Sequence, residues 1–292
     1  MTVVNACTRD GRGGSPTAVV IDDSTLGDDE RQAIVRAAGT SHAAFIDTSS
    51  RGAPVVRFFT TAGELTNCGH GTVAAQAVQL QRSGASHHRG QQSTGGRTFA
   101  TTAVRRPDGI EVWFDQGIIK LQDCASGESG SIVAALGLKP HDVTGDLRVA
   151  SPGTPRLLVP VRDRRTLLSI QPNHDRLAAD CRRLGYLGCF VYALTPTGTK
   201  ATARMFAPAI GVDEDIVNAN STGCLAAHLL DTGHAGRIEV HQGDALGRPS
   251  SVCATAVRDR DGIRTRIGGS ASTSGFGHRD GAWQFWRSSK AQ

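Results

Sequence analysis

The chain has 292 residues, of which 39% are hydrophobic and 20% charged, and its formal net charge is +5 at pH 7. These proportions are typical of a soluble globular protein that buries a sizeable core, as one large domain or as two of about 150 residues. No run approaches the ~20 consecutive apolar residues of a membrane-spanning helix, so we expect no membrane association.

The cysteine pattern indicates neither disulfides nor a metal site. The seven cysteines are odd in number and scattered, at positions 7, 68, 124, 181, 189, 224 and 253. No CxxC pair or Cys/His cluster has the spacing of metal ligands, and the first residues lack the apolar core of a signal peptide. We therefore expect no metal and a reduced, cytoplasmic location.

The positive charge does not indicate a nucleic-acid partner. It comes largely from arginines in small groups with acidic residues between them, and aromatic residues make up only 5% of the chain. No basic stripe alternates with aromatic rings that would stack on bases, so the charge is interpreted as a solvated surface.

The first part of the chain is predicted to combine strands with one surface helix. This helix begins at Asp28, has acidic residues in its first turn and ends before Gly39. Residues 85–98 are polar and contain several glycines, and they are predicted to form an exposed loop. Strands are expected at residues 2–6, 17–21, 55–59, 99–104 and 110–114.

The most informative stretch runs from Phe58 to Leu80. A strand-like apolar run leads through a polar turn into a helix-like run from His70, whose residues are nearly all small or apolar, so this helix is expected inside a core. Cys68 comes just before it, where glycines let backbone N–H groups approach a ligand and the helix N-terminus favours an anion or a thiolate. The residues alone leave open the alternative of a buried structural cysteine beside an ordinary glycine turn.

The second half of the chain repeats this order of elements. A polar turn and the glycine-containing segment 218–224 precede a second apolar helix of small residues, which ends before Gly233. The order suggests two similar lobes, each wrapping a sheet around one central helix, with ligand chemistry in a cleft that two helix N-termini face. The last strands are expected at residues 238–241, 251–257, 263–267 and 282–286.

We place the N-terminal lobe at residues 1–114 plus 281–292 and the C-terminal lobe at residues 115–280. The active site is expected in the cleft between them.

Several motifs in this chain carry a family resemblance. Cys68-Gly69-His70-Gly71-Thr72 resembles the first catalytic-cysteine motif of proline racemases. A wider set of motifs runs in order along the chain and is similar to the PhzF-like isomerases: Gly14-Ser15-Pro16, Gly153-Thr154-Pro155-Arg156, Arg204-Met205-Phe206-Ala207-Pro208, Glu214-Asp215 and Gln242-Gly243. Both groups belong to the superfamily of diaminopimelate epimerase.

This resemblance implies an α+β fold of the diaminopimelate epimerase type. Its two pseudo-symmetric lobes each have a curved mixed sheet wrapped around a central helix. The resemblance also implies a cofactor-independent enzyme without a metal, and a homodimer.

Two departures from the family pattern bear on chemistry. PhzF-like enzymes carry a Ser-Glu pair whose glutamate is the acid and base, whereas this chain has Ser41-His42. The racemases carry a second cysteine near the second helix, and Asn220 is assigned here to that position. Cys224 follows four residues later and is expected to pack in the core.

These departures favour a one-base proton shift over inversion of a stereocentre. Inversion needs a base on one face and an acid on the other, and the Asn220 amide neither accepts nor delivers a proton near neutral pH. His42 or Cys68 would carry the proton, and His42 is slightly preferred because a neutral imidazole is already a base. Asp215 is assigned to the catalytic set and would, like His70, orient the substrate.

The predicted substrate-binding residues flank the two helix starts. Backbone N–H groups of Gly69, His70, Ser221 and Thr222 would hold a substrate carboxylate. The remaining predicted substrate-binding positions are Ser41, Gly71, Asn220 and Gly223.

The expected function is an isomerase that moves a double bond in a small carboxylate, in secondary metabolism. The resemblance points to the alkylproline unit of lincosamide and pyrrolobenzodiazepine antibiotics. Two alternatives stay open: an amino-acid racemase or epimerase, and a non-catalytic small-molecule binding protein on the same fold.

Overall fold

The computed structural model describes residues 1–22, 25–49, 52–124 and 126–272. Within these ranges the chain forms two compact units, residues 1–114 with 268–272 and residues 115–267. Residues 268–272, expected in the C-terminal lobe, belong to the first unit because strand β16 (Gly262–Ser272) pairs there with β1 (Thr2–Thr8), Asn5 opposite Ser272. Residues 281–292, expected to rejoin the N-terminal lobe, and the strand expected at residues 282–286 lie outside the described residues.

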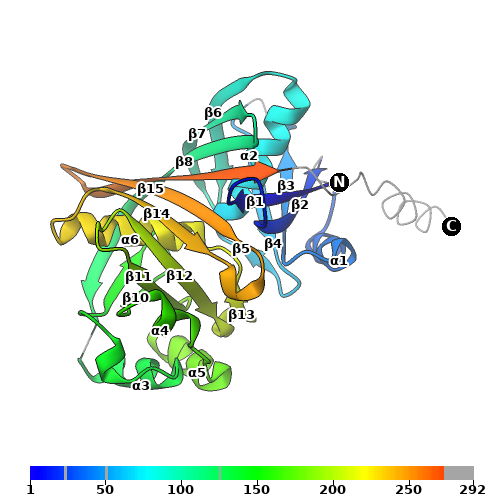
Figure 1. The fold of residues 1–292 in the computed structure, drawn as a ribbon. Helices are drawn as coiled ribbons and strands as arrows, with labels where there is room; N and C mark the ends of the chain where they lie inside the picture. The colour runs from blue at the N-terminus through cyan, green and yellow to red at the C-terminus, as the bar shows by residue number, and fades with distance from the viewer. Residues whose placement is uncertain (23–24, 50–51, 125, 273–292) are drawn as a thin grey trace. The chain divides into compact units, whose positions relative to one another are not determined.

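The first unit contains one mixed sheet (Figure 1). Its strands hydrogen-bond in the order β8-β7-β6-β4-β3-β2-β1-β16, with β5 beside β4. β2 and β3 pair in parallel, which requires the crossover that α1 supplies, whereas β1 and β2 pair antiparallel. The elements are β1 (Thr2–Thr8), β2 (Ser15–Asp22), α1 (Asp28–Ala38), β3 (His42–Asp47), β4 (Val55–Phe59), β5 (Glu64–Leu65), α2 (Gly69–Ser83), β6 (His87–Thr94), β7 (Arg97–Arg106) and the start of β8 (Gly109–Asp123).

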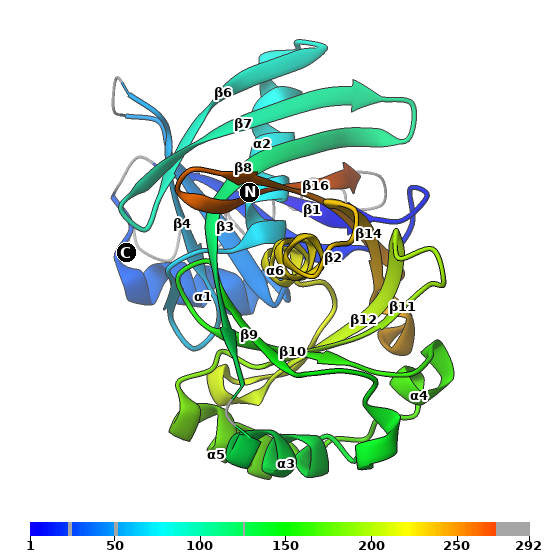
Figure 2. The same ribbon diagram turned by 90° about the vertical axis from the view of Figure 1, so that its left-hand side faces the viewer.

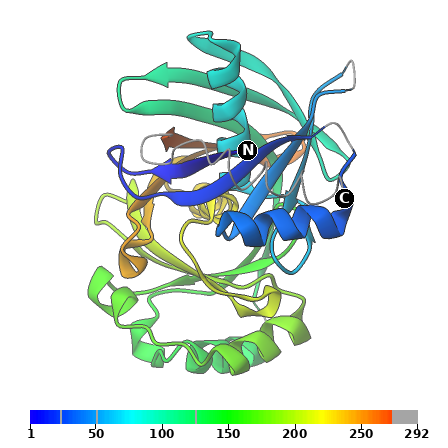
Figure 3. The ribbon, with the colours of Figure 1, turned by 90° about the vertical axis from the view of Figure 1, so that its right-hand side faces the viewer.

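Helix α2 is the central helix of this unit and α1 its surface helix. α2 packs against β1, β2, β3, β4 and β7, and every residue from Gly69 to Val78 is buried, as the apolar run predicts. α1 lies against β3 and β4 (Figure 3), where Ile34 and Val35 pack on Phe45. It ends at Gly39, whose φ of 65° is the left-handed conformation that glycine adopts without strain.

The second unit also curves a mixed sheet around one helix. Figure 2 shows α6 end-on, with β9, β10, β12 and β14 arranged around it. The elements are α3 (Ser126–Ala135), β9 (Arg148–Ser151), β10 (Arg156–Pro160), α4 (Arg164–Leu168), α5 (His174–Leu184), β11 (Cys189–Leu194), β12 (Lys200–Ala207), β13 (Val212–Asp215), α6 (Ala219–Asp231), β14 (Arg237–Gln242), β15 (Ser250–Asp259) and β16 (Gly262–Ser272).

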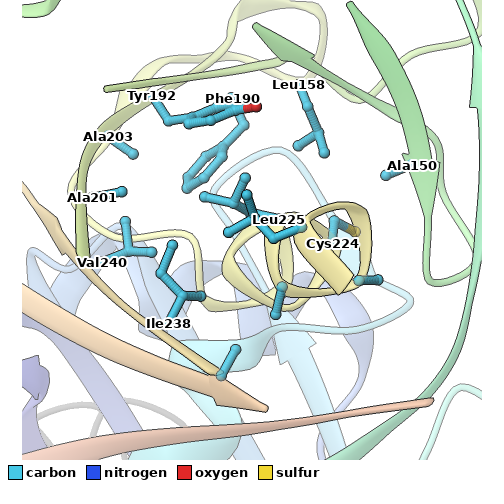
Figure 4. Close-up of a cluster of buried hydrophobic side chains, with 14 of the residues drawn as sticks. Ala150, Leu158, Phe190, Tyr192, Ala201, Ala203, Cys224, Leu225, Ile238 and Val240 are labelled. Carbon is cyan, nitrogen blue, oxygen red and sulfur yellow. The ribbon is translucent and has the colours of Figure 1, made fainter. Parts of the chain in front are cut away.

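Side chains on the two faces of this second sheet form separate cores. Leu158 of β10 joins the cluster around α6, where Figure 4 shows Cys224 and Leu225 among its side chains. Its neighbours Leu157 and Val159 join the opposite cluster, with residues of α3, α4 and α5, because successive side chains of a strand point to opposite faces.

Two elements differ from the sequence-based expectation. Residues 85–98 were predicted to form an exposed loop, but β6 and β7 pair there from His87 opposite Val104 to Thr94 opposite Arg97. Helix α6 begins at Ala219, within the segment expected to precede it, because Asn218 caps it. Among the helices of the described chain, none has the length and apolar character needed to cross a membrane.

Candidate active site

Three side chains with proton-transfer chemistry meet in the first unit. His42 begins β3, whereas Cys68 and His70 lie at the N-terminal end of α2. One ligand atom from each of the three lies within 4.8 Å of the others, and all three side chains are buried. Sγ of Cys68 and Nε2 of His70 are hydrogen-bonded at 3.4 Å, and the rings of His42 and His70 meet edge to face with centroids 4.4 Å apart.

Cys68 is the N-cap of α2. Its Sγ accepts a hydrogen bond from the Gly71 N–H at 3.3 Å, and its carbonyl accepts the Thr72 N–H at 2.9 Å. The cap therefore engages the amides of Gly71 and Thr72. A Cβ at Gly71 would lie 2.8 Å from the Phe58 ring and 3.0 Å from Sγ, so a glycine is needed for this close approach.

His42 is oriented by its neighbour Ser41. Nδ1 of His42 lies 2.9 Å from the exposed Ser41 hydroxyl, which leaves Nε2 as the ring nitrogen that does not engage Ser41. Burial, and next the nearby His70, lower the pKa of His42 well below its usual value. His42 is therefore neutral at pH 7 and can act as a base without first losing a proton.

The cluster also has the donor set of a metal site, which the sequence analysis did not find. The sequence shows no metal-ligand spacing for these three residues because His42 lies in strand β3, 26 positions before Cys68 at the start of helix α2. The fold, and not a local motif, brings the two histidines and the thiol together.

The remaining predicted site residues lie in the second unit, around the start of α6. Asp215, the last residue of β13, accepts a hydrogen bond at 3.1 Å from Nδ2 of Asn218. Asn218 is the N-cap of α6, and its Oδ1 accepts hydrogen bonds from the N–H and the hydroxyl of Ser221 at 3.0 and 2.8 Å. The buried Arg156 donates to the Ser221 hydroxyl at 3.3 Å.

The amides of Ser221 and Thr222 are not available as predicted. The Ser221 N–H bonds to Asn218 Oδ1, and the Thr222 N–H bonds to the Asn218 carbonyl at 3.3 Å. Both side chains are fully buried, and the Thr222 hydroxyl accepts a hydrogen bond from Gln242. These two residues thus hold the helix start together, and we do not retain them as carboxylate ligands.

The Gln116 side chain contacts two other predicted site residues, Asn220 and Gly223. Its Nε2 donates to the carbonyl of Asn220 at 2.9 Å, and its Oε1 accepts from the Thr265 hydroxyl at 2.7 Å. A Cβ at Gly223 would clash with Oε1, so a larger residue there would displace the Gln116 amide from its hydrogen bonds. Gly223 therefore leaves space for the Gln116 side chain.

The two central helices start in the same way. In each, the N-cap side chain accepts the N–H three residues on, and the N-cap carbonyl accepts the N–H and the hydroxyl of the threonine four residues on. In each, that threonine hydroxyl also accepts a hydrogen bond from a glutamine twenty residues later, Gln92 for Thr72 and Gln242 for Thr222. Cys68 and Asn218 thus occupy equivalent positions.

This equivalence corrects the assignment of Asn220. The residue that stands where a second thiol would be is Asn218, two positions earlier, and it too is an amide. Asn218 is not among the residues predicted for the site, although an asparagine directly before a small-residue helix is a common N-cap. Cys224 lies in the core around α6, and burial raises the pKa of its thiol to about 11.

The sequence of this chain is similar to the sequences of two proteins named as isomerases. The chain is 30% identical to uncharacterized isomerase YddE of Escherichia coli O157:H7, in an alignment covering 88% of this chain and 90% of the relative. It is 29% identical to trans-2,3-dihydro-3-hydroxyanthranilate isomerase of Pseudomonas fluorescens, covering 90% and 93% of the two chains.

Solved structures agree on the fold. The PhzF-family phenazine biosynthesis protein of Bacillus anthracis superposes with a TM-score of 0.80 at 21% identity, over 92% of this chain and 95% of that one. A predicted epimerase of Pseudomonas aeruginosa gives 0.79 at 27% identity, over 93% and 95%. A hydroxyproline epimerase of Agrobacterium vitis gives a TM-score of 0.62 at 12% identity, over 94% of this chain and 90% of that one, so the two proteins share a fold.

The family model described as phenazine biosynthesis-like protein, PhzC-PhzF, matches residues 4–277, nearly the whole chain. The fold predicted from the sequence, α+β of the epimerase type, is thereby confirmed. Because the match spans both units and the relatives are isomerases, this chain belongs to the PhzC-PhzF family and is an isomerase-type enzyme.

Proposed function

We propose that this enzyme moves a double bond in a small carboxylate substrate by a one-base proton shift, without a cofactor. The observation that carries the proposal is the buried cluster of His42, Cys68 and His70. One group first takes a proton from a carbon beside a conjugated system, and the electron pair of that C–H bond enters the conjugation. The same group returns the proton to a carbon further along, so the product is an isomer and no electrons leave the substrate.

His42 is the proton carrier in this proposal. Its low pKa keeps the imidazole neutral, and the resulting imidazolium would give the proton back readily. Ser41 holds Nδ1, so Nε2 is the atom that transfers the proton. His70, which contacts both His42 and Cys68, would position the substrate and the proton carrier.

The absence of a second thiol supports a shift over an inversion. Asn218 occupies the position equivalent to Cys68, and an amide does not shuttle protons near neutral pH. We keep Asp215 as a substrate-orienting residue, since its carboxylate is held by the same Asn218.

The substrate class we propose is a cyclic amino acid with a conjugated side chain, the precursor of an alkylproline antibiotic unit. Such a molecule supplies a carboxylate, an anion that the N-terminal end of helix α2 favours. It also supplies the conjugation along which one base can move a proton. The relative named trans-2,3-dihydro-3-hydroxyanthranilate isomerase is likewise named for a small cyclic amino carboxylate.

Deuterium incorporation tests the reaction type. A conjugated alkylidene-proline acid in D2O should isomerise, with deuterium entering only at the carbon that receives the proton. Proline, hydroxyproline and diaminopimelate should show no deuteration at the α-carbon. Rapid α-deuteration with inversion of any of these three would establish a racemase or epimerase, the alternative reaction that a cysteine at a helix start favours, and would refute the proposal.

A further inference from the structure

We propose that His42, Cys68 and His70 form a binding site for Zn²⁺, and that the bound ion inhibits the isomerase by occupying its proton-transfer groups. The binding part stands on the geometry of the cluster alone. The inhibition part rests on the proposed function.

The donor set selects a thiophilic transition metal. Two imidazoles and one thiolate suit Zn²⁺, whereas Mg²⁺ and Ca²⁺ prefer oxygen ligands. In the described part of the chain no Asp or Glu belongs to this cluster. Three protein ligands leave a fourth tetrahedral position for water or a substrate carboxylate.

The spacing of the donors is close to that of a zinc site. Zn–N and Zn–S bonds of about 2.0–2.3 Å in a tetrahedron put neighbouring ligand atoms about 3.3–3.6 Å apart. Cys68 Sγ and His70 Nε2 are already 3.4 Å apart, and the whole set lies within 4.8 Å. Small side-chain rotations of His42 would complete the site.

Neighbouring groups hold the ligands in place. The Ser41 hydroxyl engages Nδ1 of His42 and leaves Nε2 to bind the ion, as partners of zinc-bound histidines commonly do. The Gly71 N–H donates to Sγ and would stabilise a metal-bound thiolate. Because the cluster is buried, little water competes for these donors.

The chemistry of binding needs no further reactant. The Cys68 thiol releases one proton to the solvent, and its thiolate and the two neutral imidazoles each donate one electron pair to the ion. Nothing is oxidised, so a chelator should reverse the reaction.

Binding is tested with Co²⁺, which reports a thiolate ligand by absorption. The reduced, metal-free protein should bind one equivalent of Co²⁺. The bound ion should show a thiolate-to-metal charge-transfer band and the visible absorption bands of a tetrahedral Co²⁺ ion. Addition of Zn²⁺ should displace the Co²⁺ and remove both features. Cys68→Ser should abolish the charge-transfer band, and Ser41→Ala should weaken binding about 10-fold. Cys253→Ser and His88→Gln, which change one half-buried cysteine and one exposed histidine, are the matched controls and should bind like the wild type.

The wild-type titration decides the binding proposal even if a variant does not fold. No charge-transfer band in the wild type, or a band that persists in a folded Cys68→Ser, would overturn the site. The inhibition is tested separately: one equivalent of Zn²⁺ should remove isomerase activity and EDTA should restore it. A metal-saturated enzyme with full activity overturns the inhibition. A protein that binds the metal but shows no isomerase activity even when it is metal-free would instead refute the proposed function.

Discussion

Sγ of Cys68 lies 3.4 Å from Nε2 of His70, two residues further along the same helix start. His70 in turn meets the ring of His42 edge to face, so it contacts both candidate proton carriers. Cys68 and His42 contact His70 from different elements, so replacing one of them leaves the other's contact with His70 in place. Single substitutions can therefore show which of the two carries the proton.

Replacing the proton carrier should remove both halves of the transfer. His42→Gln is expected to lower turnover about 10²–10⁴-fold and to abolish deuterium incorporation at the shifted carbon. Cys68→Ala should mainly raise KM, because it removes a contact of the positioning residue His70. Steady-state kinetics and NMR in D2O measure both effects.

The controls for this comparison are Cys253→Ser and His88→Gln, which should retain wild-type turnover. Near-normal turnover in His42→Gln together with an inactive Cys68→Ala would assign the proton transfer to the thiol. If both variants keep their activity, His70 becomes the next residue to replace.

The equivalence of Cys68 and Asn218 predicts a difference between two neighbouring asparagines. Asn218→Ala removes an acceptor for the Ser221 N–H, and should lower the free energy of unfolding by about 1–2 kcal/mol. Asn220→Ala leaves the Asn218 cap in place, and it keeps the hydrogen bond from Gln116 to the backbone carbonyl of residue 220, so it should not destabilise α6 through loss of its cap. Urea unfolding of the two variants compares these losses, and a larger loss for Asn220→Ala would contradict the equivalence.

The error of two positions at this helix has a physical cause. Motif spacing counts residues, whereas the cap is defined by which side chain accepts the N–H three residues on. Asn218 and Asn220 have the same chemistry, so the type of residue gave no warning. The conclusion that no second thiol stands there was unaffected.

The helices were predictable because their signals are local. Acidic residues and a terminal glycine define α1, and an unbroken run of small and apolar residues defines α2. Strand β6 lacks such a local signal, because its polar residues are equally typical of a loop. Its first residues are exposed and polar, and the strand forms because β7 satisfies its backbone hydrogen bonds, which no local pattern records.

The candidate site, too, is only partly predictable from local sequence. His42, Cys68 and His70 were identified from motifs and departures from them, but their contacts depend on β3 and α2 packing together. The roles of Gln116 and Arg156 depend on contacts between residues far apart in the sequence, so only the structure reveals them.

Removing one partner of the buried pair Arg204 and Glu214 should be strongly destabilising. Its two hydrogen bonds measure 2.9 and 2.7 Å, both side chains are about nine-tenths buried, and Arg204 also donates to the carbonyls of Leu167 and Ile170. Glu214→Gln leaves the buried guanidinium without its counter-charge and should lower the free energy of unfolding by about 3 kcal/mol. Urea denaturation at pH 7 measures the loss.

The matched control is Glu64→Gln, which breaks the equally close but more exposed pair with Arg57. That loss should stay below about 1 kcal/mol, because water already screens the pair. Equal losses for the two variants would show that burial does not set the strength of the inner pair.

Glu239 should make stability depend on pH in the acid range. Partial burial raises its pKa, but hydrogen bonds from His241, Lys200 and Ser251 lower it more in total, from an ordinary value of 4.5 to about 2. Because the folded state binds the Glu239 proton less tightly than the unfolded state, the stabilisation is fully present above about pH 4.5 and is lost as the pH falls toward 2. Glu239→Gln should therefore be less stable than the wild type at pH 6, by about 0.2–1 kcal/mol for this partly exposed group, and the difference should shrink below pH 4.5. Urea unfolding of both proteins at pH 6, 4.5 and 3 measures it, and a difference that stays constant across this range would show that the Glu239 carboxylate is not held in the folded state by these three donors.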